Sequence, residues 1–284
     1  MECCNVTKPA LLSGSRIALV GNPNVGKSML FHRLTGKYVT VSNYPGTTVE
    51  ITQGALRGLP DVIVIDTPGI VSFPPRSEDE AVTARVLLQG NLDGIVQVGD
   101  AKNLRRTLHL AVQLAEMGRP LALALNMMDE AGARGLQVNT EKIAAALKIP
   151  VVGTVATRGQ GIDRLLKAIQ EAGPAPLRLT YPDEIESALE ELAEMLPEAP
   201  VSRRALGLLW LSRDAACEAW LAENTPPQTL ASLRALRDLL DSSASETSAA
   251  VIQRTRSAFA ETLAAQALAG QGTGQKSLAI QISR

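Results

Sequence analysis

The first 173 residues alternate between short apolar runs and stretches whose apolar positions recur at helical spacing. Polar segments at 36–46 and 70–79 are expected to be loops. Strands that alternate with helices indicate an α/β domain, with a sheet flanked by helices. The apolar runs predict strands at 16–20, in the second half of 47–52, and at 61–66, 94–99, 121–125 and 151–154. The helical spacing predicts helices over 28–34, 80–89, 103–117, 141–147 and 163–171.

The alternation ends near Gly173-Pro174-Ala175-Pro176, a composition typical of a linker. Beyond it, apolar residues recur only at helical spacing, and prolines divide the chain into roughly five helices. These helices are expected over 185–196, 203–211, 214–223, 228–241 and 246–269. The pattern therefore predicts a leader at 1–15, an α/β domain at 16–173, a linker at 174–180, a helical bundle at 181–270 and a flexible tail at 271–284.

A glycine-rich loop follows the first predicted strand and precedes the first predicted helix. Its residues fit the pattern G-x-x-x-x-G-K-[ST] and read Gly21-Asn22-Pro23-Asn24-Val25-Gly26-Lys27-Ser28. The backbone amides of such a loop and the helix N-terminus point at one spot, where phosphate oxygens bind. Lys27 adds a positive charge for the β- and γ-phosphates, and the Ser28 hydroxyl is a ligand for Mg²⁺.

Two further segments carry groups that suit the metal ion and the γ-phosphate. The strand predicted at 61–66 ends in Asp66, whose carboxylate suits Mg²⁺, and the nearby Gly69 amide can approach the γ-phosphate closely. Thr48 is the candidate for a second hydroxyl on Mg²⁺, with Thr47 as the alternative. An ordinary threonine at a strand edge is the other interpretation. Loops that touch the γ-phosphate would be ordered by GTP and released on hydrolysis.

The strand predicted at 121–125 runs into an N-x-x-D pattern that reads guanine. The Asp129 carboxylate would accept hydrogen bonds from N1–H and the exocyclic amine of guanine, a donor pair that adenine lacks. Asn126 would tie this loop to its neighbours, and the Met127 thioether would cover the base where lysine is usual. In the later loop that begins at 155, the backbone amide of Ala156 or Thr157 would meet guanine O6.

Composition disfavours several other classes of function. The net charge is −1 and aromatic residues make up 3%, which argues against nucleic acid as a partner. Three cysteines (Cys3, Cys4, Cys217) and two histidines (His32, His109) form no C-x-x-C pair and no metal-ligand cluster, which favours a reducing, cytosolic setting. No signal peptide is visible, and no window approaches the roughly 20 apolar residues of a membrane span, so we expect a soluble chain.

The ordered motifs GNPNVGKS, TTVE, DTPG, NMMD and VATRGQG resemble a translational-type small GTPase of the Era and MnmE branch. Further details resemble the cytoplasmic part of the FeoB ferrous-iron transporters: the run Asn43-Tyr44-Pro45-Gly46-Thr47-Thr48-Val49-Glu50, the methionine-bearing NMMD and a helical domain directly behind the GTPase domain. The resemblance covers about residues 16–265. It implies a P-loop, Ras-like GTPase domain with a mixed sheet, followed by a small all-α bundle.

The resemblance also implies ligands and partners. The GTPase domain would bind GTP, GDP and Mg²⁺, and Thr48 matches the metal-binding threonine of the family. Asn24 matches the asparagine that helps to hold K⁺ in potassium-activated members. The helical part resembles the family's spacer, linked to holding GDP and to the membrane-embedded region of the full-length transporter. The implied location is the cytoplasmic face of the bacterial inner membrane. Whether the chain forms a homo-oligomer is left open.

Together these inferences define the expected site. The Mg²⁺ ligands are Ser28, Thr48 and Asp66, and the K⁺ ligand is Asn24. The residues expected to act in catalysis are Asn24, Lys27, Thr48 and Gly69. The residues expected to contact the nucleotide are Gly21, Asn22, Pro23, Asn24, Val25, Gly26, Lys27, Ser28, Met29, Gly46, Thr47, Thr48, Asp66, Gly69, Asn126, Met127, Asp129, Val155, Ala156 and Thr157.

The residue after Gly69 is Ile70, where Ras-like enzymes have a glutamine that orients water. We therefore expect slow hydrolysis alone and stimulation by K⁺, which would neutralise charge between the β- and γ-phosphates. The leading interpretation is a GTP-binding and GTP-hydrolysing switch that regulates a membrane ferrous-iron transporter. Two alternatives stay open: a free-standing GTPase acting on RNA or ribosomes, and a nucleotide-holding interaction module with negligible catalysis.

Overall fold

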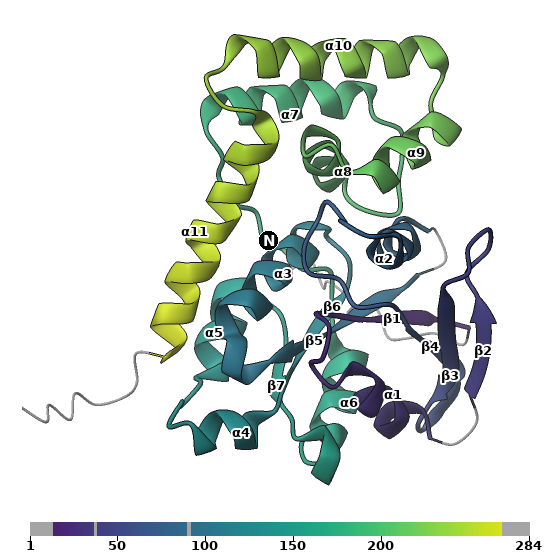
Figure 1. The fold of residues 1–284 in the computed structure, drawn as a ribbon, viewed down its shortest axis with the longest axis vertical. Helices are drawn as coiled ribbons and strands as arrows, with labels where there is room; N and C mark the ends of the chain where they lie inside the picture. The colour runs from purple at the N-terminus through teal and green to yellow at the C-terminus, as the bar shows by residue number, and fades with distance from the viewer. Residues whose placement is uncertain (1–13, 37–38, 90–91, 269–284) are drawn as a thin grey trace, which may run out of the picture.

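The computed structural model describes residues 14–36, 39–89 and 92–268. The predicted tail at 271–284, and the predicted leader apart from residues 14 and 15, lie outside these ranges. Within them the chain forms an α/β domain and a helical bundle stacked end to end (Figure 1). No helix in these ranges combines the length and the hydropathy that crossing a membrane requires.

Seven strands form one mixed sheet in the order β2-β3-β4-β1-β5-β6-β7. The sheet is antiparallel from β2 to β4 and parallel from β4 through β1, β5 and β6 to β7. The predicted mixed sheet is thus confirmed, and the parallel strands bring the phosphate, metal and base segments to one edge of the sheet. The strands are β1 (Arg16–Gly21), β2 (Val39–Asn43), β3 (Glu50–Leu56), β4 (Leu59–Asp66), β5 (Gly94–Asp100), β6 (Leu121–Asn126) and β7 (Val151–Gly153).

Helices cover both faces of the sheet. Ile17 and Leu19 of β1 pack with α1 and α6, whereas Ala18 and Val20 belong to the core on the opposite face with α2, α3 and α5. A strand buried on both faces is apolar at every position, and this gives β1 its clear sequence signal. The helices are α1 (Lys27–Thr35), α2 (Glu78–Leu88), α3 (Leu104–Glu116), α5 (Thr140–Leu147) and α6 (Ile162–Glu171).

Two elements differ from the prediction. The segment 36–46, predicted to be a loop, contains β2, whose five residues are all exposed. This edge strand is held by its backbone ladder to β3 and not by burial. The short alternation Val39-Thr40-Val41-Ser42 is typical of a strand, but the surrounding polar residues and glycines predict a loop. The second difference is α4 (Met128–Ala133), a helix of six residues that begins inside the N-x-x-D pattern. It is too short to show a helical period.

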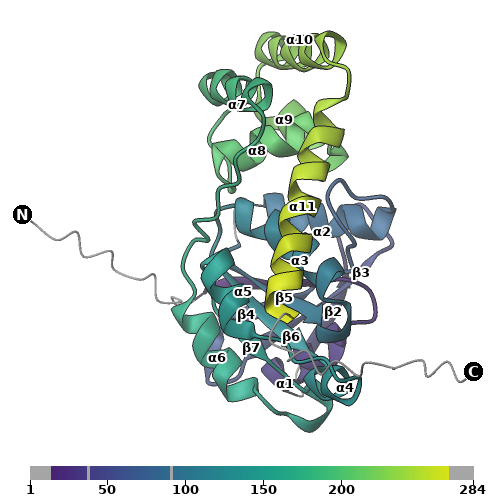
Figure 2. The same cartoon turned by 90° about the vertical axis from the view of Figure 1, so that its left-hand side faces the viewer.

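Five helices follow the α/β domain within the described residues, as predicted. The last of them, α11, turns back and packs along α3 and α5 of the α/β domain (Figure 2). In addition, α2 packs against α9. The bundle therefore contacts the α/β domain through α9 as well as through α11. The five helices are α7 (Asp183–Met195), α8 (Arg203–Leu211), α9 (Ala215–Asn224), α10 (Pro227–Ser243) and α11 (Ser248–Leu268).

Candidate nucleotide-binding site

The phosphate loop leaves β1 at Gly21 and enters α1 at Lys27, and two residues between them hold left-handed backbone conformations. Asn24 has φ 64° and Gly26 has φ 82°. Space also excludes a side chain at Gly26, because a Cβ atom there would lie 2.5 Å from Nδ2 of Asn126. The second glycine of the motif is thus required because the base segment packs directly on the loop.

The loop borders an open cavity of about 560 Å³. A concave site of this size accommodates a small ligand. The other side of the cavity is formed by Ser77, Asp79 and Glu80, at the start of α2. The predicted nucleotide contacts that line it are Asn22, Pro23, Asn24, Gly26, Lys27, Ser28, Met29 and Gly69.

Three predicted polar groups meet beside this cavity. The Lys27 ammonium forms an ion pair with Asp66, and Ser28 Oγ donates a hydrogen bond of 3.1 Å to Oδ2 of Asp66. The side chains of Lys27 and Asp66 are only 12% and 10% exposed. A hydroxyl and a carboxylate are oxygen ligands of the kind that Mg²⁺ prefers, so Ser28 and Asp66 fit the predicted metal ion.

Gly69 lies directly against the phosphate loop, since a Cβ atom there would approach the backbone of Pro23 to 3.1 Å. The next peptide groups are also fixed by the loop. The Ile70 N–H donates to the Gly21 carbonyl at 2.9 Å, and Asn22 Nδ2 donates to the Ile70 carbonyl at 2.9 Å. The Ile70 side chain is fully buried in the core. It therefore offers the phosphates no polar group that orients water.

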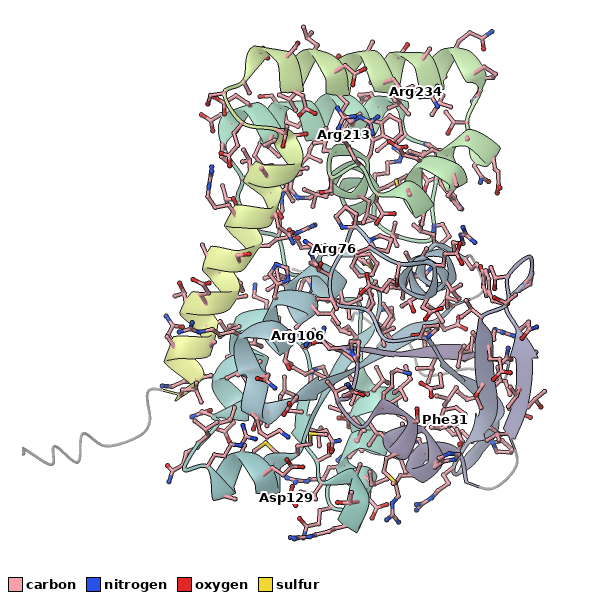
Figure 3. The ribbon with its side chains drawn as sticks, in the orientation of Figure 1. Phe31, Arg76, Arg106, Asp129, Arg213 and Arg234 are labelled. Carbon is pink, nitrogen blue, oxygen red and sulfur yellow. The ribbon has the colours of Figure 1, made fainter. Side chains whose placement is uncertain are left out.

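Two buried side chains hold the backbone of the segment that follows. Glu80 accepts hydrogen bonds from the N–H groups of Val71 at 3.1 Å and Arg76 at 2.7 Å. Gln113 of α3 accepts from the Phe73 N–H and donates to the Phe73 carbonyl, both at 3.0 Å. Figure 3 shows Arg76 near the junction of the two domains. Neither Glu80 nor Gln113 is predicted from the sequence, because each is a polar residue on a helix that belongs to no motif.

The residues Gly46, Thr47 and Thr48 line a second cavity of about 520 Å³, against α2. The Thr47 hydroxyl donates to the Tyr44 carbonyl at 2.9 Å and so serves the local turn. Thr48 is exposed. In the described part of the chain, neither threonine is among the residues that line the first cavity. Thr48 as a Mg²⁺ ligand therefore stays a prediction, and it requires the loop to move.

Asn126 joins the segments of the site. Its Nδ2 donates to the Val25 carbonyl at 2.9 Å, and its Oδ1 accepts from Thr154 Oγ1 at 3.1 Å and from the Ala156 N–H at 3.0 Å. The residue is only 3% exposed. Two backbone amides are expected at guanine O6. That of Ala156 donates to Asn126, whereas that of Thr157 does not.

The two other residues of the base pattern lie at the rim of the same region. Met127 has φ 61°, and its terminal methyl lies 3.7 Å from the position that a Cβ of Gly26 would occupy. The Asp129 side chain is 28% exposed, and Nη2 of Arg158 lies 3.8 Å from its Oδ2. Figure 3 shows Asp129 at the end of the α/β domain remote from the helical bundle. The carboxylate is therefore accessible to a ligand.

The loop at 155–160 is closed on itself and held from outside. Val155 and Gln160 exchange two backbone hydrogen bonds of 3.1 and 3.2 Å. Arg33 of α1 donates from Nε to the Ala156 carbonyl at 2.9 Å and from Nη2 to the Thr157 carbonyl at 2.7 Å. Sequence reasoning does not single out Arg33, because a basic residue in the last turn of a helix is ordinary.

Both parts of the chain match family models. Residues 15–169 match the model described as ferrous iron transport protein B, FeoB. The chain belongs to the FeoB family. Residues 181–269 match the FeoB cytosolic helical domain, so the two parts occur in the order expected of the family.

FeoB relatives are much longer than this chain. The Fe(2+) transporter FeoB of Staphylococcus aureus strain MSSA476 is 36% identical over 181 residues, which are 63% of this chain and 27% of the relative. That of Escherichia coli strain K12 is 36% identical over 216 residues, which are 73% of this chain and 28% of the relative. The match thus spans less than a third of these FeoB proteins.

Solved FeoB structures share the fold. The structure of NFeoB from S. thermophilus bound to GDP, AlF4⁻ and K⁺ has a TM-score of 0.74 and 32% identity, and the match covers 88% of this chain and 99% of that one. The cytosolic domain of T. maritima FeoB in its GMPPNP form has a TM-score of 0.72 and 27% identity, with 89% and 98% covered. The predicted fold class, a GTPase-type domain followed by a helical domain, is thereby confirmed.

Proposed function

We propose that this chain binds GTP and GDP and hydrolyses GTP, as the nucleotide-responsive switch of a membrane ferrous-iron transporter. The observation that carries this proposal is the position of Asn126, whose buried amide bonds the phosphate loop at Val25 and the base loop at Ala156. One side chain thus sets the distance between the phosphate end and the base end of the site. Asp129 then selects guanine, because its carboxylate pairs with the two donors on that base.

The residues around the phosphates have distinct roles in hydrolysis. Lys27 and the amides of its loop would hold the β- and γ-phosphates, while Ser28 and Asp66, which are hydrogen-bonded to each other here, would hold Mg²⁺ and so supply positive charge beside the phosphates. Water attacks the γ-phosphorus as the bond to the β,γ-bridging oxygen breaks, and the Gly69 amide binds a γ-oxygen. Because Ile70 is buried and apolar, the attacking water receives no side-chain help from that position.

In this proposal Asn24 would help to hold a monovalent cation, which would supply positive charge beside the transferring phosphate. Asn24 lines the phosphate cavity and can offer its side-chain oxygen to K⁺. The S. thermophilus relative has been solved with GDP, AlF4⁻ and K⁺ together, which supports such a site. A cation held there would stabilise the negative charge that develops on the phosphates during transfer.

A chain of contacts runs from Gly69 to the helical bundle. Gln113, which holds the Phe73 backbone, also donates from Nε2 to Oε1 of Gln253 on α11 at 3.3 Å. A rearrangement at Gly69 on hydrolysis therefore reaches α11 through Phe73 and Gln113. In the full-length transporter the bundle would pass this change to the membrane-embedded region, with the present domains at the cytoplasmic face of the bacterial inner membrane.

Nucleotide binding and single-turnover hydrolysis by the purified chain test the proposal. In Mg²⁺ the chain is expected to bind GTP and GDP, to reject ATP and to release phosphate slowly from GTP. Lys27→Ala removes the phosphate charge and should abolish tight binding, whereas Lys167→Ala, on the exposed face of α6, should change nothing. Equal affinity for ATP and GTP would contradict the proposal.

A nucleotide-holding module without catalysis is the second candidate, and the burial of Ile70 is the observation that favours it. Single-turnover measurements with excess protein separate the two. Guanine-selective binding without phosphate release, in KCl as well as in NaCl, would select the holding module over the GTPase.

A further inference from the structure

One basic side chain in the site belongs to none of the motifs. Arg33 lies in the last turn of α1, and its guanidinium contacts two successive carbonyls of the base loop. Nε donates to the Ala156 carbonyl at 2.9 Å and Nη2 donates to the Thr157 carbonyl at 2.7 Å. A planar guanidinium offers two donors in fixed relation, so it can hold two neighbouring acceptors at once, which an ammonium group cannot do in the same way.

The contact with the first carbonyl also determines where a neighbouring amide points. The Ala156 carbonyl and the Thr157 N–H belong to one planar peptide group, in which they point in opposite directions. The preceding peptide group is fixed by Asn126, which accepts from the Ala156 N–H at 3.0 Å. Both peptide planes beside Ala156 are therefore clamped, one by Asn126 from β6 and the other by Arg33 from α1.

The clamp links the base loop to the helix that carries the phosphate loop. Arg33 lies six residues after Lys27, a distance of about 9 Å along an α-helix. α1 and α6, the helix that follows the base loop, pack together (Figure 1). The helix whose N-terminus receives the phosphates thus also holds the loop expected at the base.

We propose that Arg33 is a positioning residue for guanine recognition, which aims the Thr157 N–H at O6 of the base. This inference rests on the proposed function, because it requires a guanine nucleotide in the site. In this arrangement Asp129 reads the N1–H and the exocyclic amine of guanine, while the peptide group held by Arg33 reads the oxygen at position 6.

Three nucleotides separate these two contributions: GDP, IDP, which lacks the exocyclic amine, and 6-thio-GDP, which replaces O6 by a poorer acceptor. Their affinities are measured by displacement of a fluorescent GDP from the purified chain and from Arg33→Ala. The variant should bind GDP about tenfold more weakly, the effect of losing the hydrogen bond from the Thr157 N–H to O6 of the base. Its preference for GDP over 6-thio-GDP should shrink, while its preference for GDP over IDP should persist.

Two companion variants sharpen the test. Arg33→Lys keeps the positive charge but loses the guanidinium that bonds both carbonyls. It should therefore restore the preference for GDP over 6-thio-GDP only in part. Arg57→Ala is the matched control, since Arg57 forms an exposed ion pair with Asp163 of α6 at 3.6 Å and contacts neither carbonyl. It should leave all three affinities unchanged. If Arg33→Lys restored this preference fully, the simultaneous contact of the guanidinium with both carbonyls would not be what positions the loop.

Other outcomes would contradict either the positioning role of Arg33 or the proposed binding of guanine nucleotides. An unchanged affinity of Arg33→Ala for GDP contradicts the positioning role. An equal loss of both preferences together with a lower melting temperature also contradicts it, because the residue would then only stabilise the fold. If the unaltered chain shows no preference for GDP over IDP or ADP, the proposed function itself fails.

Discussion

Nε of Arg256 lies 2.7 Å from Oε2 of Glu116, and both side chains are only 3% exposed. The pair joins α11 of the helical bundle to α3 of the α/β domain. The Tyr181 hydroxyl, at the start of the helical domain, donates to the same carboxylate at 2.8 Å. Burial raises the pKa of the Tyr181 phenol, so it remains a proton donor. The Glu116 carboxylate of the α/β domain is thus bonded by two residues of the helical domain, Tyr181 and Arg256.

Breaking this pair from one side should be costly. Arg256→Met leaves the Glu116 charge buried without its partner, and we expect the free energy of unfolding to fall by about 3–5 kcal/mol. The double variant Arg256→Met with Glu116→Leu removes both charges and should recover a large part of that loss. Urea unfolding of the three proteins checks this expectation. A double variant that is no more stable than Arg256→Met would show that the pair is not coupled.

The buried carboxyl of Asp214 should make the stability of the helical bundle depend on pH. Its Oδ1 accepts from the Cys217 N–H at 3.0 Å, and among the described residues its buried Oδ2 has no hydrogen-bond partner. Burial raises the pKa of this carboxyl from 3.8 to about 6. The folded state therefore binds a proton more tightly than the unfolded state, so this group's contribution to stability falls as pH rises from about 4 to 6.

Asp214→Asn removes this titration and should retain the helix cap. On going from pH 8 to pH 5, the wild type should gain about 1 kcal/mol of unfolding free energy relative to Asp214→Asn. Urea unfolding at pH 5, 6, 7 and 8 measures the difference. Parallel pH profiles for the two proteins would exclude a raised pKa at Asp214.

Hydrolysis should depend on the monovalent cation. We expect GTP turnover in KCl to exceed that in NaCl by about tenfold, because charge neutralisation at the transferring phosphate lowers the barrier. Asn24→Gly should lose the difference between the salts. Glycine is the suitable replacement, since Asn24 has φ 64° and an alanine there would add backbone strain. Equal rates of the wild type in both salts would remove the cation from the mechanism.

Much of the site is predictable because each motif follows a buried strand. The phosphate loop, Asp66 and Asn126 all come directly after apolar runs, and parallel strands place their ends at one edge of the sheet. The local pattern thus implies a three-dimensional neighbourhood. Comparison with the glutamine of Ras-like enzymes identifies Ile70 as unable to orient water, and the structure shows its side chain fully buried.

The elements that sequence reasoning misses are those held by distant partners. β2 is exposed along its whole length and forms through pairing with β3, and its alternation covers only two valines, Val39 and Val41. Arg33 contacts carbonyls 123 and 124 residues further along the chain, and Gln113 holds a residue 40 positions earlier. A polar side chain on a helix has no local feature that reveals such a bond. These contacts become visible only with the fold.

We propose that Asp129 recognises guanine in this site, and the variant Asp129→Asn provides the sharpest test. Xanthine carries a second oxygen where guanine has its amine, so an asparagine amide should pair with xanthine as the carboxylate pairs with guanine. Binding of GTP and XTP is compared for the wild type, Asp129→Asn and the adjacent control Glu130→Gln. We expect a preference for GTP in the wild type and the control, and for XTP in Asp129→Asn. A strong preference of Asp129→Asn for GTP would contradict it.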